Sequence, residues 1–232
     1  MKKYAIIVAG GTGSRMKGDV PKQFMLLGGK PVILYSIEAF HEYDPSLQII
    51  VVVHPDYIDY WNGLCLEYKI AFLVQIVPGG ETRFESVKNG LGVIEDEGLV
   101  AVHDAARPVI NVEFLGRLYS EALDFGNAIP GIQLNETIRA IEGDNSRQID
   151  RSTLRVMQTP QVIKISELKQ AYKQFYKPNF TDDAAVIESA GFHLHLTEGL
   201  KGNIKITHPQ DIILAEVLLK MNLYSADIHH VK

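Results

Sequence analysis

The chain has 232 residues, of which 46% are hydrophobic, and it carries a formal net charge of −5. This length and apolar content suit one large α/β domain with a substantial core, and they exclude a disordered chain. The negative charge excludes a general nucleic-acid-binding surface, and the single cysteine, Cys65, excludes an intrachain disulfide framework and a cysteine-based zinc site.

The first predicted element is a strand over residues 4–9, YAIIVA, because an unbroken apolar run is typical of a strand covered on both faces. The run is too short for the hydrophobic segment of a signal peptide, and no later run reaches the length of a transmembrane helix. We therefore expect a cytoplasmic protein that binds neither membranes nor nucleic acid.

A glycine-rich loop with basic side chains follows this strand. Its notable residues are Gly10, Gly11, Gly13, Arg15, Lys17 and Lys22. A buried strand that ends in such a loop places backbone N–H groups where a polyphosphate can sit, and nearby cations can neutralise the phosphate charge. We interpret residues 4–23 as a site for a nucleoside triphosphate; an ordinary tight turn between strand and helix is the alternative.

Two other kinds of glycine loop do not fit the sequence. A Walker A loop needs a lysine followed by serine or threonine at a fixed distance from its glycines, and no such pair stands there. The dinucleotide-binding fingerprint, counted from Gly11 through Gly13, needs a third glycine where Met16 stands. A P-loop and a dinucleotide-dependent dehydrogenase are therefore poor interpretations.

The next segments alternate between helix and strand patterns. Apolar residues at helical spacing predict helices over 31–43 and 56–66, and short apolar runs predict strands over 48–54 and 72–77. This alternation predicts a mostly parallel sheet flanked by helices and joined by right-handed crossovers. Ligands should then gather at the carboxyl ends of the strands.

Residues 78–92 form a second polar segment. A glycine pair that ends at Gly80 turns the chain, and a helix is predicted over 81–90 with Arg83 and Ser86 near its start. A helix N-terminus presents N–H donors, and a serine hydroxyl can bond the edge of a pyrimidine. The alternative is an amphipathic helix whose charges are solvated.

Residues 99–108 predict a fourth strand that runs into a polar elbow. Asp104 at its carboxyl end is followed by two small residues, so it can approach ribose and phosphates closely. Its carboxylate could hold Mg²⁺ directly or through water, because hard oxygen ligands suit that ion. One acidic residue cannot form a metal cage alone, so the triphosphate oxygens must supply most of the coordination. We interpret His103 as a structural histidine at the strand end.

The remaining segments continue the α/β pattern. Pro130 in one of the strands indicates a bend or an edge position, and Thr181 is predicted to cap the helix that contains Asp182 and Asp183 in its first turn. Lys205 alternates with two isoleucines, so it should point away from their core face. The predicted helices are 112–125, 165–176, 180–191 and 210–219, and the predicted strands are 128–134, 156–162, 193–197 and 202–207.

Residues 135–155 are polar and alternating, with a turn at 143–145, and they predict a two-stranded hairpin that projects from the domain. An isolated hairpin is marginally stable in water. It should need a partner surface, so we predict a homodimer with exchanged arms; a loose surface hairpin is the alternative.

Three stretches carry a resemblance that covers nearly the whole chain: VAGGTGSRM with PKQF, VHDAARP, and TPQ. They resemble the sugar-phosphate nucleotidylyltransferases, and among these the IspD family of 2-C-methyl-D-erythritol 4-phosphate cytidylyltransferases in the non-mevalonate isoprenoid pathway. The resemblance implies a Rossmann-like nucleotidyltransferase fold over residues 1–232 as one domain, with a β-arm at about 135–155 that serves dimerisation. It also implies transfer of CMP from CTP to 2-C-methyl-D-erythritol 4-phosphate, with release of pyrophosphate.

The resemblance assigns roles to individual residues. Arg15 and Lys22 are the expected catalytic residues at the α-phosphate, assisted by Mg²⁺ in the region of Asp104. The expected CTP contacts are Ala9, Gly10, Gly11, Gly13, Gly80, Glu81, Ser86, Asp104, Ala105 and Lys205. The expected contacts to the acceptor are Arg107, Thr137, Arg151, Thr159 and Thr181, with Thr137 and Arg151 reaching into the partner's active site. The family often has aspartate where this chain has Glu81.

Two other functions stay open at this point. A ribitol-5-phosphate cytidylyltransferase shares the glycine loop, the HDAARP elbow and the arm, although the TDDA segment at 181–184 favours the methylerythritol enzyme. A noncatalytic nucleotide sensor could use the same fold. Pyrophosphate release from CTP in the presence of an acceptor separates the sensor from both enzymes.

Overall fold

A computed structural model describes residues 1–11, 20–70 and 74–228, and its centre is a mostly parallel sheet. Within the described residues the sheet has eight strands in the order β10-β7-β11-β6-β1-β4-β5, with β12 paired to β7. The strands are β1 (Lys2–Ala9), β4 (Gln48–Val53), β5 (Val74–Pro78), β6 (Gly98–Asp104), β7 (Asn127–Gln133), β10 (Arg155–Met157), β11 (Gln161–Lys164) and β12 (Leu196–Glu198). β1 pairs in parallel with β4 and β6, whereas β10 and β11 run antiparallel to their neighbours, so the predicted fold class is confirmed.

Helices cover both faces of the sheet because alternate strand residues point to opposite sides. Ile7 of β1 lies in a core shared with α1 (Val32–Tyr43), α2 (Ile58–Glu67) and α4 (Val112–Phe125). Its neighbour Ile6 lies in a second core with α3 (Arg83–Gly92), α5 (Ile165–Ala171) and α6 (Asp183–Ser189). The continuous apolar run of β1 thus serves two cores, as a central strand of a doubly covered sheet must.

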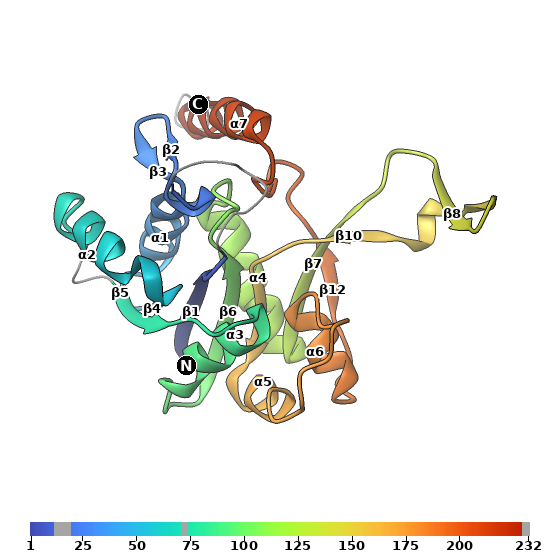
Figure 1. The fold of residues 1–232 in the computed structure, drawn as a ribbon, viewed down its shortest axis with the longest axis horizontal. Coiled ribbons are helices and arrows are strands. Elements are labelled where there is room, and N and C mark those ends of the chain that lie inside the picture. The colour runs from blue at the N-terminus through green and yellow to red at the C-terminus, as the bar shows by residue number, and fades with distance from the viewer. Residues whose placement is uncertain (12–19, 71–73, 229–232) are drawn as a thin grey trace.

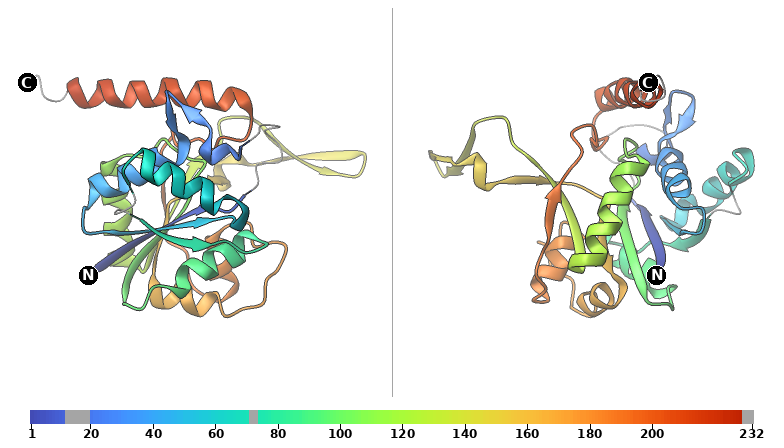
Figure 2. Two further views of the ribbon diagram at one scale, coloured as in Figure 1. Left: turned by 60° about the vertical axis from the view of Figure 1, so that its left-hand side comes forward. Right: turned by 180° about the vertical axis from the view of Figure 1, so that it is seen from behind.

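A third, smaller core attaches the last helix, α7 (Pro209–Ile228), beyond one end of the sheet (Figure 2). Leu27, Val109, Ile206 and Ala215 pack together there with no more than trace exposure. Leu27 belongs to a small hairpin of β2 (Leu26–Leu27) and β3 (Lys30–Pro31), which follows the short 3₁₀ helix η1 (Lys22–Phe24). Within the described residues no helix combines the length and apolar character needed to cross a bilayer.

The predicted hairpin is present as β8 (Ile138–Glu142) and β9 (Asn145–Ile149), followed by the 3₁₀ helix η3 (Arg151–Thr153). In the described structure its strands pair only with each other, and most of their side chains are exposed. Figure 1 shows this arm extending away from the body of the molecule. Arg147 and Glu142 form an exposed ion pair across it.

Several predicted boundaries need correction. The segment 202–207 is not a strand: its buried residue Ile206 makes one backbone hydrogen bond to the carbonyl of Ala106 instead of joining a ladder. The strand predicted over 156–162 is interrupted between β10 and β11, and the helix predicted over 165–176 already ends at Ala171.

The edge position suggested for Pro130 is wrong, because β7 has partners on both sides. The carbonyl of Pro130 faces the break between β10 and β11, where the backbone N–H of Gln158 donates to it at 2.9 Å. The proline's missing N–H therefore falls where the ladder is already interrupted, which is one of the places where a strand tolerates proline.

The predicted cap of the helix at 180–191 is also wrong. α6 is capped by Asp182, whose carboxylate accepts a hydrogen bond from the backbone N–H of Ala185 at 2.9 Å. Thr181 lies one residue earlier and is exposed. Threonine and aspartate are both good caps, so residue type alone does not choose between neighbours.

Candidate active site

A cavity of about 360 Å³ lies at the carboxyl ends of β1, β4 and β6. It brings together the glycine loop, the start of η1, the start of α3 and the end of β6. The sequence-predicted residues that line it are Gly10, Gly11, Lys22, Gly80, Glu81, Ser86, Asp104, Ala105 and Lys205. Gly13 and Arg15 lie outside the described residues, so their assignments stay predictions.

The backbone that directly follows β1 is held by Gln23, a residue to which sequence reasoning gave no role. Its buried amide Nε2 donates to the carbonyls of Ala9 at 2.7 Å and Gly11 at 2.9 Å. The neighbouring Lys22 reaches the cavity wall, and its Nζ donates to the carbonyl of Ile206 at 2.8 Å. Consecutive residues of the Pro-Lys-Gln motif therefore hold the backbone at Ala9 and Gly11 and place a lysine at the cavity.

The start of α3 forms the opposite wall. Thr82 and Glu85 make a reciprocal capping box: the Thr82 hydroxyl accepts from the backbone N–H of Glu85, and the Glu85 carboxylate accepts from that of Thr82, both at 3.1 Å. One turn later, the buried hydroxyl of Ser86 accepts from the backbone N–H of Gly80 at 3.1 Å. A Cβ at Gly80 would stand 2.3 Å from that of Glu85, so only glycine fits this close approach.

Asp104, at the end of β6, is a carboxylate surrounded by three basic side chains. Its two oxygens accept from Arg83 Nε at 3.2 Å and from Lys205 Nζ at 2.7 Å, and the Arg107 guanidinium lies 3.9 Å away. Burial opposes ionisation of Asp104, but these cations outweigh burial and hold its pKa well below the ordinary value. The cavity therefore contains a permanently charged carboxylate among basic groups.

Arg83 has a second partner that sequence reasoning did not identify. Its NH2 group donates to Asp183 at 2.7 Å, and Asp183 in turn accepts from the hydroxyl of Tyr172 at 2.6 Å. Asp183 is fully buried, and its ion pair with Arg83 links the first turns of α6 and α3. Burial would lower the pKa of Arg83, but the charges of Asp183 and Asp104 raise it well above the usual value.

His103 is buried behind this wall, as a structural histidine should be. Its Nε2 lies 3.2 Å from the Ser36 hydroxyl and 3.0 Å from the carbonyl of Arg107, and its Nδ1 lies 3.2 Å from the Thr159 hydroxyl. Burial lowers the pKa of His103 to about 4. The imidazole is therefore neutral near pH 7 and serves as a hydrogen-bonding hub between helix α1 and the elbow after β6.

The five residues assigned to the acceptor are not brought together in one chain, and their roles stay predictions. Arg107 and Thr159 lie behind the cavity wall: Arg107 donates to the carbonyl of Asn203 at 2.9 Å, and the Thr159 hydroxyl accepts from the backbone N–H of Asp104 at 3.0 Å. Thr181 is exposed before α6. Thr137 and Arg151 line a separate hollow of about 250 Å³ on the arm.

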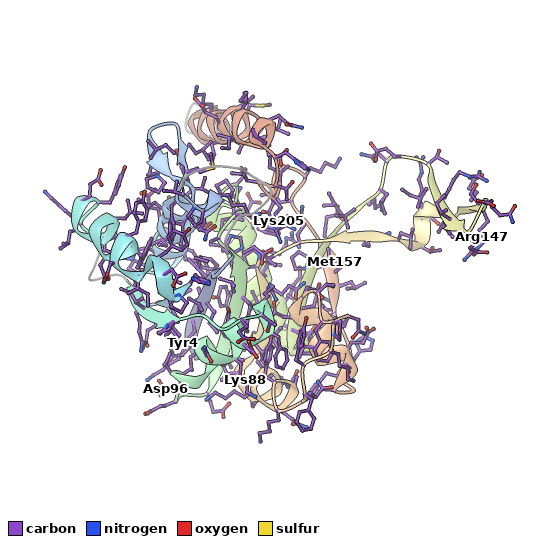
Figure 3. The ribbon with its side chains drawn as sticks, in the orientation of Figure 1. Tyr4, Lys88, Asp96, Arg147, Met157 and Lys205 are labelled. Carbon is purple, nitrogen blue, oxygen red and sulfur yellow. The ribbon has the colours of Figure 1, made fainter. Side chains whose placement is uncertain are left out.

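Figure 3 makes this separation visible. Lys205, which borders the cavity, lies over the body of the molecule, whereas Arg147 lies at the far tip of the arm. Met157 stands where the arm returns to the body.

The cavity offers an acidic side chain, Asp104, to a divalent metal ion. No group of three or more histidine, cysteine, aspartate or glutamate side chains is suitably placed within the described part of the chain. Asp104 nevertheless offers a permanently ionised carboxylate at the cavity. One carboxylate suits Mg²⁺, which keeps several waters and commonly completes its coordination with substrate phosphates. The residues present thus fit an ion that arrives with a triphosphate.

Comparisons with known proteins extend over the sheet, the cavity and the arm. The sequence model of the family IspD, 2-C-methyl-D-erythritol 4-phosphate cytidylyltransferase, matches residues 4–221. The 2-C-methyl-D-erythritol 4-phosphate cytidylyltransferases of Bacteroides thetaiotaomicron and Phocaeicola vulgatus are each 46% identical to this chain over 219 residues, which is 94% of this chain and 100% of each relative. The crystal structure of the Francisella tularensis enzyme of that name matches with a TM-score of 0.78 and 30% identity, covering 94% of this chain and 100% of that chain.

Proposed function

The chain belongs to the IspD family of cytidylyltransferases, which act in isoprenoid biosynthesis, and from this premise we propose how its residues transfer CMP from CTP to 2-C-methyl-D-erythritol 4-phosphate. The observation that carries the proposal is the cavity of about 360 Å³ in which the glycine loop, Lys22, Ser86, Asp104 and Lys205 meet. Its position at the carboxyl ends of parallel strands is where α/β sheets bind ligands.

The reaction is an in-line displacement at phosphorus. A phosphate oxygen of the acceptor forms a bond to the α-phosphorus of CTP, and the bond from that phosphorus to the oxygen of the β-phosphate breaks, so that pyrophosphate leaves. The attacking phosphate is already anionic, and no general base is required. The work of the protein is therefore to align two anions and to stabilise the charge that develops at the α-phosphate.

Lys22 carries the stabilising charge in this mechanism, together with Arg15. The position of Lys22 in the cavity wall, beside the backbone that directly follows β1, supports this role. Gly10 and Gly11 let the triphosphate approach the backbone closely, and Lys205 adds a further cation. A lysine suits the role because its compact ammonium binds phosphate as a point charge.

Ser86 and Gly80 read the cytosine. The Ser86 hydroxyl lies at the start of α3, and a Cβ added at Gly10 would come within 3.1 Å of it. With no Cβ at Gly10, this hydroxyl keeps its place in the lining of the cavity, where the base is proposed to sit. Glu81, exposed at the rim of the cavity, contributes the acidic side chain at the position where the family often has aspartate.

Mg²⁺ is the proposed cofactor, held by Asp104 and by the triphosphate. When bound, the ion neutralises phosphate charge and orients the leaving group. Asp104 is kept ionised by Arg83, Lys205 and Arg107, so it is ready to accept the ion at any physiological pH.

The acceptor site is proposed to be completed by a second copy of the chain. Arg107, Thr159 and Thr181 belong to the body, whereas Thr137 and Arg151 belong to the projecting arm. A homodimer with exchanged arms would carry the last two to the partner's cavity and would cover the exposed hairpin. We place the enzyme in the cytoplasm, where CTP and a charged polyol phosphate are available.

The test is pyrophosphate release by the purified protein with CTP and Mg²⁺. Release is expected with 2-C-methyl-D-erythritol 4-phosphate and should be far slower with ribitol 5-phosphate. Release only with ribitol 5-phosphate would overturn the acceptor assignment while keeping the cavity chemistry. If neither acceptor leads to pyrophosphate release and the protein still binds CTP, the result would instead support a nucleotide sensor.

A further inference from the structure

Asp183 is a buried carboxylate that the mechanism above does not use. Its side chain is completely inaccessible, and it does not line the cavity. A buried charge is costly unless it is paired and hydrogen-bonded. Here each oxygen has one partner: Oδ2 accepts from Arg83 NH2 at 2.7 Å, and Oδ1 accepts from the Tyr172 hydroxyl at 2.6 Å.

Arg83 occupies the position between this carboxylate and the cavity. Its guanidinium donates through Nε to Asp104 and through Nη2 to Asp183, so two nitrogens of one rigid planar group are fixed at once by two carboxylates. Arg83 itself lines the cavity and is the first residue of α3, the helix that carries Ser86. The orientation of the guanidinium therefore bears on both the carboxylate and the helix start that face the nucleotide.

Tyr172 donates a hydrogen bond to the other carboxylate oxygen of Asp183. Its ring stacks on Phe84, the residue next to Arg83, with 4.6 Å between ring centroids and 21° between planes. One tyrosine thus orients Asp183 through its hydroxyl and packs against α3 through its ring. Burial raises the pKa of Tyr172 well above its ordinary value, so the hydroxyl stays a donor throughout the physiological range.

We propose that Asp183, held by Tyr172, is a positioning residue that fixes Arg83 against Asp104 and so shapes the CTP site from outside the cavity. Without this carboxylate, Arg83 would keep Asp104 as its only anionic partner among the described residues and would be free to turn toward it. The contact between Arg83 and Asp104 would then no longer be fixed from the side of α6, and the start of α3 would lose its link to that helix. The inference rests on the proposed CTP site.

The test measures the dissociation constant of CTP with Mg²⁺ by titration calorimetry, independently of turnover. Asp183→Asn keeps the shape of the side chain and removes its charge, and it should weaken CTP binding about ten-fold, as the loss of one charge-assisted hydrogen bond allows. Tyr172→Phe keeps the ring stacked on Phe84 and removes only the hydroxyl, and it should weaken binding about three-fold.

Asp44→Asn is the matched control. Asp44 also pairs with a lysine, Lys3, at 2.9 Å, but it follows α1 and contacts the amino end of β1. This variant should lose stability without a change in CTP affinity. If Asp44→Asn lost as much CTP affinity as Asp183→Asn, general destabilisation would explain both losses, and the proposal would be overturned.

A double-mutant cycle separates positioning from a purely structural role. If Asp183 acts through Arg83, Asp183→Asn should change CTP affinity little in an Arg83→Gln background. Equal losses in both backgrounds, or an Asp183→Asn affinity equal to that of the wild type, would overturn the proposal. Should Asp183→Asn not fold, Tyr172→Phe decides by the same cycle. A wild-type protein that binds no CTP would instead overturn the proposed function.

Discussion

At the scale of single residues, the catalytic role proposed for Lys22 rests on its place at the cavity. Lys22 stands beside Gln23, which holds the carbonyls of Ala9 and Gly11, and its own Nζ lies against the carbonyl of Ile206. The backbone around it is therefore fixed before any ligand arrives, and little ordering is needed to present the ammonium. Preorganised charge of this kind is usually the largest single contribution to catalysis.

Lys22→Ala should leave the fold intact and cut turnover by about 10²–10³, the usual effect of removing one well-placed donor. The measurement is kcat for pyrophosphate release, with circular dichroism to check folding. Lys88→Ala, which removes an exposed lysine of α3, is the control and should retain wild-type turnover. Near-normal turnover of Lys22→Ala would exclude a catalytic role.

His103 should make the protein less stable in mild acid. Burial lowers its pKa to about 4 from the ordinary 6.5, so between these values the unfolded chain binds a proton that the folded chain does not. This contribution to stability is full above about pH 6.5, falls as the pH drops toward 4, and amounts to a loss of about 2 kcal/mol at pH 5.

Urea unfolding at several pH values, without nucleotide or Mg²⁺, checks this expectation. His103→Gln has no titrating group at this position, so its stability should fall less than that of the wild type between pH 6.5 and 5. The carboxylates are the same in both proteins and cancel in the difference. Parallel pH dependences would show that His103 does not cause the loss.

The sequence predicted those cavity residues that stand next to the end of a strand. Gly10 and Gly80 come shortly after strands and Asp104 is the last residue of one, so their place at one edge of the sheet follows from the α/β pattern. Asp183 could not be found in this way. Its contact with Arg83 joins residues 100 positions apart, and an acidic residue in a first helical turn is fully explained by the helix itself. Gln23 was missed because buried amide-to-backbone bonds leave no pattern in the sequence.

At the scale of elements, α3 is the helix whose start lines the cavity, and its proposed part in binding the base depends on a rigid first turn. Its capping box satisfies N–H groups at Thr82 and Glu85, and it fixes the turn from which Arg83 and Ser86 project. Thr82→Ala should lower the free energy of unfolding by about 1 kcal/mol. It should also raise the KM for CTP, because a frayed first turn displaces the Ser86 hydroxyl.

Two variants isolate the effect of this cap. Thr82→Ser retains a hydroxyl acceptor and should behave almost as the wild type. Asn111→Ala removes the cap of α4, where the Asn111 side chain accepts from the backbone N–H of Phe114 at 2.9 Å, and should reduce stability without raising the KM for CTP. An unchanged KM in Thr82→Ala would mean that the start of α3 does not need its cap to read the base.

Elements were predictable where local signals agree with tertiary packing. α4 begins and ends where predicted, because Asn111 caps its start and Gly126, at a φ of 92°, ends it. The prediction for segment 202–207 failed because its alternating isoleucines look like a strand, although of these two isoleucines only Ile206 is fully buried. Alternation reports which side chains are buried, but a strand also needs a neighbour with free backbone groups.

At the scale of the whole molecule, the arm and the cavity are separate in one chain. The hairpin exposes most of its residues and extends away from the body (Figure 1), and Thr137 and Arg151 line a hollow on this arm. The proposed exchange between two copies would account for both facts, because each arm would gain a surface and each cavity would gain Thr137 and Arg151 of the partner subunit. The dimer would have two-fold symmetry, with two equivalent composite sites.

Mixing two defective chains tests this arrangement. Lys22→Ala has an intact arm but a defective cavity, and Arg151→Ala has an intact cavity but a defective arm. In a mixed dimer, the cavity of the second chain receives the arm of the first, so one of the two sites is complete. Random exchange makes half of the dimers mixed, and the mixture should recover about a quarter of wild-type activity.

The control pairs Lys22→Ala with the double variant Lys22→Ala/Arg151→Ala, in which no combination restores a complete site. Sedimentation velocity should show a dimer for every sample, so that a difference in activity reflects which residues meet and not assembly. If the first mixture shows only the sum of its two components after subunit exchange is verified, each arm serves the cavity of its own chain. That result would require the arm to fold back onto the body, and it would move Thr137 and Arg151 by a hinge at the base of the arm rather than by exchange.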